Sequence, residues 1–421
     1  MMLIKLLKDN PNVDNFSVKT DKKESVEMFF ALGKLETVRK TNVENSMVTV
    51  YTKNGEFMGE ASFSVFPSDS KSALQNKIES ALNSAHLVNN KPYELPKEEH
   101  LVKSIKSNMK DIDFVEMGKK IYGIADKVIK ETGAQINALE IFMDKKSTEI
   151  ENGNGLKKKM NYYNLFIEAI PTYDKGEDSY ELYQAINLSV FDEAKIEDEL
   201  RKYLEQVKNR AYAVRPTEKI DAPVILNKEE LSELFNNLAD MLHYQTKYNH
   251  GNIFDVGDDI QKGNGDKINL EVKSYIPGSS HNKVFDNDGA SFKDKVLIKD
   301  GIVEAFYGGT KYASYLGKEI TGNLPCVEVQ AGSADFDKIC QKPYFECLSF
   351  SGIQIEEYSD YLGGEVRLAK YFDGKEVKYI TGVSISGSLS EILRSMKLSK
   401  KKALYGNYLG PDKALMKMEI M

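Results

Sequence analysis

The closest pair of histidines in this 421-residue sequence lies just past its midpoint. His243 and His250 are seven residues apart, and none of the five histidines is followed by glutamate. On one continuous helix this spacing puts both imidazoles on the same face, but about 10 Å apart along the axis. That span is long for a zinc ion bound at roughly 2.1 Å per ligand, unless the helix ends early near Asn249 and Gly251. Two interpretations stay open: a metal site that a cysteine would help to complete, and the favoured one, two structural histidines at a helix end.

A pair of aspartates further along the chain has two possible roles. Asp286 and Asp288 could serve as an acid and a base, because neighbouring carboxylates can divide these tasks. Asn287 and Gly289, which lie between and beside them, instead favour an Asx-type turn. The sequence also lacks the glycine-rich Gly-Lys-Ser/Thr loop that binds phosphates and the G-x-S-x-G turn that exposes a nucleophilic serine. The catalytic residues, if any exist, are therefore unknown from the sequence.

The overall composition excludes several classes of function. The net charge is -7, whereas nucleic-acid binding depends on clustered Lys and Arg that release counterions, so we expect no direct contact with nucleic acid. No stretch reaches the roughly 18 apolar residues that cross a bilayer, and the run Met1–Leu7 is too short for a signal peptide. The three cysteines, Cys326, Cys340 and Cys347, form no C-x-x-C pair and predict reduced thiols. We therefore expect a cytoplasmic protein without a membrane segment.

The first half of the sequence has signals for a sheet covered by helices. Strand-forming residues over 25–66 are interrupted at Asn54-Gly55, a dipeptide typical of tight hairpins. Helical spacing of apolar residues predicts helices near 74–85, 114–129 and 196–207, and strand-like runs cover 136–143, 160–170 and 180–191. Asp113 and Gly133 have the residue types that begin and end a helix. We place a domain boundary near Pro216.

The second half has one clear helix followed by mostly strand-forming sequence. A short buried strand over 222–226 leads to Asn227 and Glu230, which have the form of a capping box. The helix that follows is predicted over 228–248, and later hairpins are predicted at Asp300-Gly301 and Asp373-Gly374, with a last helix over 389–396. The fold class is therefore predicted to be α+β. It consists of an N-terminal α/β domain with an antiparallel sheet and helices (1–216) and a C-terminal, predominantly β domain (217–421).

The order of several turns resembles that of a known family. In the second half these are Asp286-Asn287-Asp288-Gly289, Lys299-Asp300-Gly301, Ile320-Thr321-Gly322-Asn323-Leu324, Asp373-Gly374-Lys375-Glu376 and Ile385-Ser386-Gly387-Ser388-Leu389. In the first half they are Asn54-Gly55, Gly59-Glu60-Ala61-Ser62 and Asn152-Gly153-Asn154-Gly155. This series resembles the TldD/PmbA family, formerly called modulators of DNA gyrase. Asp288 stands where that family commonly has glutamate, and Ser388 where it has asparagine.

The resemblance implies a peptidase-like helix at 228–248 and a role in peptide degradation or maturation. One subfamily carries an H-E-x-x-x-H motif on this helix and binds zinc, and its partner lacks the motif. When His243 is aligned with the first motif histidine, Tyr244 and Tyr248 take the positions of the glutamate and the second histidine. The resemblance thus implies the zinc-free, PmbA-like side, with no cofactor in this chain and zinc in a TldD-like partner.

Several partners and activities stay open at this stage. The chain could pair with the zinc-bearing homologue or form a homodimer, and its substrate would be an unfolded peptide. One alternative is a self-sufficient metallohydrolase with a non-standard site that uses His243 and His250. The other is a peptide-binding or regulatory protein without catalytic activity.

Overall fold

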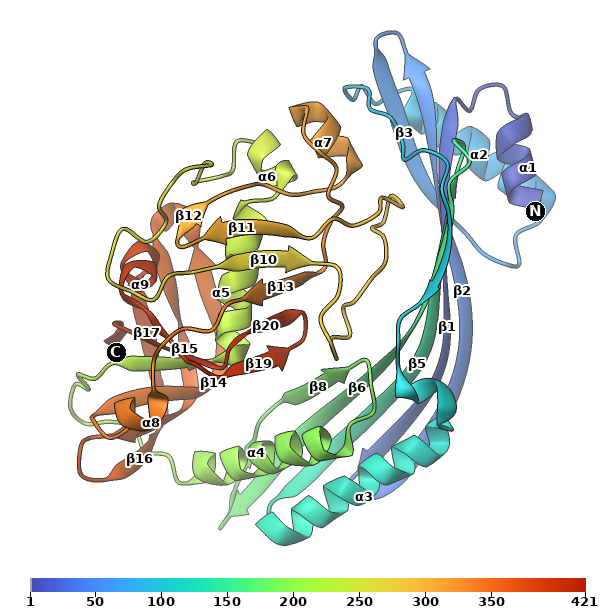
Figure 1. Cartoon of the computed structure of the whole chain (residues 1–421). Helices are drawn as coiled ribbons and strands as arrows, with labels where there is room; N and C mark the ends of the chain where they lie inside the picture. Colours follow the sequence, from blue (N-terminus) through green and yellow to red (C-terminus); the bar gives the residue numbers. More distant parts are fainter. Residues whose placement is uncertain (1) are drawn as a thin grey trace.

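The first half of the chain is built on one long, strongly bent sheet, shown in blue to green in Figure 1. The computed structural model describes residues 2–421. The strand order is β3-β2-β1-β5-β6-β4, with β7 and β8 also paired to β6, and all neighbours are antiparallel except β4 and β6. The strands are β1 (Asn15–Ala31), β2 (Lys34–Asn54), β3 (Phe57–Val65), β4 (His100–Ser104), β5 (Gln135–Asn152), β6 (Lys157–Lys175), β7 (Asp178–Glu181) and β8 (Gln184–Leu188).

Four helices cover one face of this sheet and leave the other face to the second half of the chain. α1 (Met2–Asp9) and α2 (Lys71–Ala85) pack at one end, and α3 (Phe114–Thr132) and α4 (Glu193–Ala211) at the other. Because side chains alternate between the faces of a strand, even-numbered β1 residues such as Val18 and Met28 enter these cores. Odd-numbered ones such as Lys19 and Asp21 point to the concave face.

The helix ends are capped, at Asp113 and Gly133 as predicted and also at Ser70. The Ser70 side chain accepts a hydrogen bond from the backbone N–H of Ala73, and the Asp113 side chain accepts two from the first turn of α3. Gly133 ends α3 with a φ of 70°, which a residue with a side chain adopts only at a cost. The helices predicted over 74–85, 114–129 and 196–207 are thus confirmed.

In the second half, two sheets enclose α5 (Lys228–Met241) (Figure 1). The first contains β12 (Ile302–Val303), β11 (Lys295–Lys299), β10 (Leu270–Lys273), β13 (Cys326–Val329), β20 (Tyr408–Pro411) and β19 (Lys402–Tyr405), in that order. The second has the order β18 (Lys397–Leu398), β21 (Lys413–Met416), β9 (Val224–Asn227), β14 (Tyr344–Glu356), β15 (Tyr361–Phe372), β17 (Val383–Ser388), β22 (Glu419–Ile420), with β16 (Val377–Ile380) beside β15. The remaining helices are α6 (Tyr244–Tyr248), α7 (Thr310–Leu316), α8 (Phe336–Ile339) and α9 (Leu389–Ser395).

The start of α5 forms as predicted, but its end does not. The Asn227 backbone N–H donates to the Glu230 carboxylate at 3.2 Å, as a capping box requires. The continuous helix predicted over 228–248 is wrong, because α5 ends at Met241 and α6 begins at Tyr244. The cause is a tertiary contact: Tyr307 accepts a backbone hydrogen bond from Tyr244 at 2.7 Å and donates one to Leu242 at 3.1 Å. A neighbouring segment thus replaces the helical hydrogen bonds.

The fold class is confirmed as α+β, with differences in detail. The predicted strand over 180–191 is divided into β7 and β8, and α1, α7 and α8 were not predicted. α1 covers the apolar run Met1–Leu7 except for Met1, which lies outside the described residues. The hairpin at Asp300-Gly301 is confirmed, with φ values of 51° and 82°. Among residues 2–421, no helix combines the length and apolar character needed to cross a bilayer. The domain division at 216 stays a prediction.

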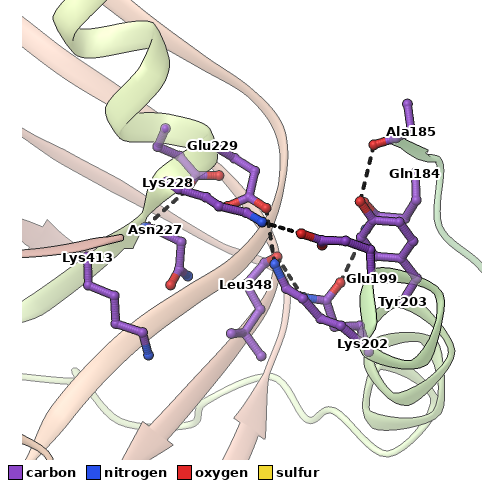
Figure 2. Close-up of polar contacts among 12 residues, drawn as sticks. Gln184, Ala185, Glu199, Lys202, Tyr203, Asn227, Lys228, Glu229, Leu348 and Lys413 are labelled. Carbon is purple, nitrogen blue, oxygen red and sulfur yellow. Dashed lines mark hydrogen bonds and ion pairs between the residues drawn. The ribbon is translucent and has the colours of Figure 1, made fainter. Parts of the chain in front are cut away.

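The halves of the chain meet at several places, two of which lie at Phe285 and at α4. At the first, Phe285 from the second half is buried against Ile150, Leu156 and Met160 of the concave sheet face. At the second, α4 and the start of α5 exchange ion pairs, as Figure 2 shows. Lys228 pairs with Glu199 there, and Lys202 with Glu229 at 3.0 Å. Both junctions place the second half inside the curve of the sheet.

Candidate functional site

The first candidate site surrounds His243, at the break between α5 and α6. His243 is the N-cap of α6, and its Nδ1 accepts a hydrogen bond of 3.1 Å from the backbone N–H of Gln245. Since Nδ1 accepts, the proton of the neutral ring is on Nε2, which donates to Asn323 Oδ1 at 2.8 Å. The ring also packs edge-on against Tyr307, with centroids 5.1 Å apart. Both ring nitrogens of His243 are therefore engaged within the chain.

Tyr244 and Tyr248, at the two positions predicted to replace the family's glutamate and second histidine, have structural surroundings. Tyr244 is buried, and its hydroxyl donates to the backbone carbonyl of Glu319 at 3.1 Å. Burial raises the pKa of this phenol, so it stays neutral. Tyr248 packs against two tyrosines of α7, with centroids 5.6 Å from Tyr312 and 5.0 Å from Tyr315. These positions supply neither a carboxylate base nor an imidazole ligand.

A cavity beside His243 shows how the two predicted histidines differ. It has a volume of about 590 Å³ and is lined by His243, Asp240, Tyr307 and Asn323, among others, but not by His250. His250 is exposed after the end of α6, with a φ of 57°. Within residues 2–421, no three His, Cys, Asp or Glu side chains group as a metal site would require. The side chains around His243 do not fit a zinc ion, because its only two ring nitrogens already have partners.

The predicted cysteine contribution to such a site is also missing from this cavity. Cys326 and Cys347 are fully buried in the cores of the second half, and Cys340 is partly buried after α8. None of the three lines the cavity beside His243. Burial raises the pKa of all three thiols, which keeps them protonated.

The second candidate, the aspartate pair, forms the predicted Asx-type turn. Asp286 is buried, and its Oδ1 accepts from the backbone N–H groups of Asp288 and Ala290, both at 2.9 Å. Gly289 completes the turn with a φ of 85°. Asp286 Oδ2 accepts from the backbone N–H of Asn323 at 3.2 Å. The Asp286 carboxylate therefore accepts hydrogen bonds from three backbone N–H groups.

The segment Thr321-Gly322-Asn323 connects the two candidates. Asn323 Oδ1 accepts from the backbone N–H of Gly309 at 2.8 Å as well as from His243, while the Asn323 backbone bonds to Asp286. Gly322 has a φ of 76°, and a Cβ there would come within 2.7 Å of the Phe292 ring. Only glycine fits this position. The motif thus fixes the distance between the α5–α6 break and the aspartate turn.

Asp288 contributes differently from Asp286, because its carboxylate has no hydrogen bond or ion pair within residues 2–421. It faces Glu60 of the concave sheet, which pairs with Lys311 at 2.5 Å and accepts from the Tyr93 hydroxyl at 3.2 Å. Burial, followed by the charges of Asp286 and Glu60, raises the pKa of Asp288 to about 7. A carboxyl group with a pKa near neutrality can give or take a proton.

The sequence predicted the aspartate turn and indicated the Thr-Gly-Asn motif, but not the residues that lie around them in the fold. Glu60, Tyr93 and Lys311 come from distant segments and carry no spacing signal of their own. Only Gly59-Glu60-Ala61-Ser62 was noted, as part of the family resemblance. The structure adds that this segment contacts α7, through the ion pair between Glu60 and Lys311.

The second half of the chain has the architecture of a peptidase-family domain. Residues 219–421 match the family model "PmbA/TldA metallopeptidase C-terminal domain". No curated protein sequence matches the chain.

Solved structures share the fold along the whole chain. TldE from Thermococcus kodakarensis is 16% identical, with a TM-score of 0.83, and the match covers 100% of this chain and 99% of that one. A proposed modulator of DNA gyrase from Thermotoga maritima is 14% identical, with a TM-score of 0.79 and coverage of 100% and 98%. Another, from Bacteroides thetaiotaomicron, is 12% identical, with a TM-score of 0.80 and coverage of 100% and 96%. At these identities the likeness establishes the fold. The family match identifies residues 219–421 as a PmbA/TldA-type C-terminal domain.

Proposed function

We propose that this chain is the zinc-free subunit of a TldD/PmbA-type metallopeptidase that acts on small unfolded peptides. One observation carries the proposal: both ring nitrogens of His243 bind groups of the chain itself, at 3.1 and 2.8 Å. A zinc ligand needs a free nitrogen lone pair, and here Nδ1 caps α6 while Nε2 carries the proton. Tyr244 and Tyr248 stand where the family's motif has its base and second ligand.

In this proposal the chain binds and orients the peptide, and a zinc-bearing homologue supplies the metal. The cleft between the curved sheet and the second half offers the surface, since two cavities lined by residues of both halves lie along it. An extended peptide can satisfy its backbone groups in such a cleft, and pockets for its side chains give selectivity. We place the protein in the cytoplasm, where its three cysteines stay reduced. A homodimer is the alternative assembly.

The test combines metal analysis with cleavage of an unfolded peptide. The purified, metal-replete chain is analysed for zinc by mass spectrometry, and cleavage is followed for the chain alone, the zinc-bearing homologue alone and the mixture. We expect zinc far below one equivalent in this chain and faster cleavage in the mixture than in either protein alone. Near-stoichiometric zinc together with chelator-sensitive cleavage by this chain alone would overturn the proposal.

Two variants sharpen this test. If a metal were bound at the histidines, His243→Ala and His250→Ala would each lower the zinc content. In our proposal neither variant changes it. Peptide binding without any cleavage in the mixture would instead support a regulatory binding protein, and would also overturn a peptidase role.

A further inference from the structure

A second cavity, of about 410 Å³, lies between the concave sheet face and the aspartate turn. We call it the lysine cavity, because five lysines line it: Lys19, Lys22, Lys23, Lys146 and Lys283. Two carboxylates also line it, those of Asp21 and Asp286. Lysines thus outnumber carboxylates among the side chains that line this cavity, in a chain whose net charge is -7.

The lysines on the sheet have carboxylate partners nearby. Lys146 pairs with Asp144 at 2.9 Å, and Lys22 pairs with Glu44 at 2.7 Å. Lys23 lies 3.6 Å from Glu27 and 3.7 Å from Asp144. These ion pairs neutralise most of the positive charge on the sheet side of the cavity.

Lys283 and Lys19 lie where the second half meets the sheet, and they differ in how well their charges are compensated. Lys19 lies 3.3 Å from Asp21 and donates to Asn287 Oδ1 at 3.1 Å. Within residues 2–421, the ammonium group of Lys283 has no hydrogen bond or ion pair. Lys283 is exposed at the surface, and the protein atoms near its ammonium group, followed by the charge of Lys19, lower its pKa. An anion bound here would gain two ammonium groups as partners.

The shape and the remaining wall of the cavity favour a small carboxylate over a polyanion. Val43 and Met160 supply apolar surface beside the lysines, and the Tyr162 ring adds an amphipathic wall. A nucleic acid needs a long basic track to release counterions, which a single cavity in an acidic protein does not offer. A peptide offers both parts that fit: one carboxylate and an apolar side chain next to it.

We propose that the lysine cavity binds a carboxylate group of the peptide substrate, held between Lys283 and Lys19. This inference rests on the proposed function, because it assumes that the cleft receives peptides. The aspartate turn links the cavity to the His243 region, since Asp286 lines the cavity and also accepts from Asn323. A carboxylate anchored here would set the register of an extended peptide in the cleft.

Peptide binding to the full-length chain tests this assignment. Fluorescently labelled peptides of one unfolded sequence are compared by anisotropy: one with a free C-terminal carboxylate, one with a C-terminal amide, and one amidated but carrying an internal glutamate. We expect one carboxylate form to bind about tenfold more tightly than the plain amide. The free acid identifies a C-terminal anchor, and the internal glutamate identifies a side-chain anchor.

A matched pair of variants locates the effect. Lys283→Gln should remove the preference for the carboxylate forms over the plain amide. Lys338→Gln, on α8 with a side chain 81% exposed, is the control and should behave as wild type. A carboxylate preference that survives Lys283→Gln, or equal binding of all three peptides, overturns the assignment while peptide binding still stands. Absence of binding for every peptide, with the chain alone and with its homologue, would reject the proposed function itself.

Discussion

The surroundings of His243 and the lysine cavity show opposite uses of polar side chains. Around His243, the imidazole, the Asn323 amide and the Tyr244 hydroxyl all have partners within the chain. At the lysine cavity and beside it, the side chains of Lys283 and Asp288 have no hydrogen-bond or ion-pair partner among residues 2–421. Buried polar groups that are fully satisfied stabilise a fold, whereas uncommitted ones are available to a ligand. This difference supports our proposals that His243 has a structural role and that peptides bind at the lysine cavity.

The largest expected effect is on the free energy of unfolding, and it comes from the Phe285 side chain beside the lysine cavity. Phe285 is 1% exposed and anchors the segment that carries both Lys283 and Asp286. Phe285→Ala should lower the free energy of unfolding by about 3–5 kcal/mol, since it removes a large side chain from a closed cluster. Urea denaturation measures this change. Phe57→Ala, at a ring that is 49% exposed, is the control and should cost less than about 0.5 kcal/mol.

The same variant should affect the two regions unequally. Hydrogen exchange of the backbone amides in 283–291 should become faster, because the turn loses its anchor on the sheet. Amides of α6 should keep their protection, because they depend on His243 and Tyr307. Equal loss of protection in both segments would mean that the cavity and the His243 region form one cooperative unit, and the comparison would fail.

The sequence predicted the local turns and helix caps correctly, but it did not predict which distant segments meet around His243 and at the lysine cavity. The caps at Asp113 and Asn227 and the turn at Asp286 depend on residues two to four positions apart, so their patterns were sufficient. The break at His243 depends on Tyr307, more than sixty residues away, and no local signal marks it. The helix was therefore predicted to continue to 248, although α5 ends at Met241. The lysine cavity was missed for the same reason, since β1, β2, β5, β6 and the loop at 283 meet only in three dimensions.

An intermediate effect is expected from the pH dependence of Asp288. Its pKa is about 7 in the folded chain, against 3.8 for the free side chain, so folding favours the protonated form. The stabilising contribution is fully present below about pH 4 and is lost as the pH rises through 7. Asp288→Asn keeps a neutral side chain. The variant should therefore gain stability relative to wild type between pH 4 and pH 7, on the order of 2 kcal/mol, and then level off.

Urea denaturation at pH 5, 6, 7 and 8 measures this difference. Asp111→Asn is the control, because the Asp111 side chain is 73% exposed, and its stability should follow wild type at every pH. If the curves of wild type and Asp288→Asn stay parallel from pH 5 to pH 8, Asp288 is ionised in the folded chain. In that case the contrast between Asp288 and the satisfied polar groups around His243 disappears.

The smallest expected effect separates a structural His243 from a metal ligand. His243→Ala removes the cap of α6 and leaves Asn323 Oδ1 with one donor fewer, which should cost about 1–2 kcal/mol. His250→Ala changes an exposed side chain and should stay within about 0.5 kcal/mol of wild type. Thermal unfolding with and without added zinc supplies the second readout, because a ligand that binds only the folded state raises the melting temperature. We expect zinc to leave the melting temperature of wild type and both variants unchanged. A zinc-dependent rise in the melting temperature of wild type that His243→Ala abolishes would show that Nδ1 or Nε2 exchanges its hydrogen-bond partner for the metal. His243 would then be a metal ligand, and the contrast between a structural His243 region and a ligand-binding lysine cavity would be wrong.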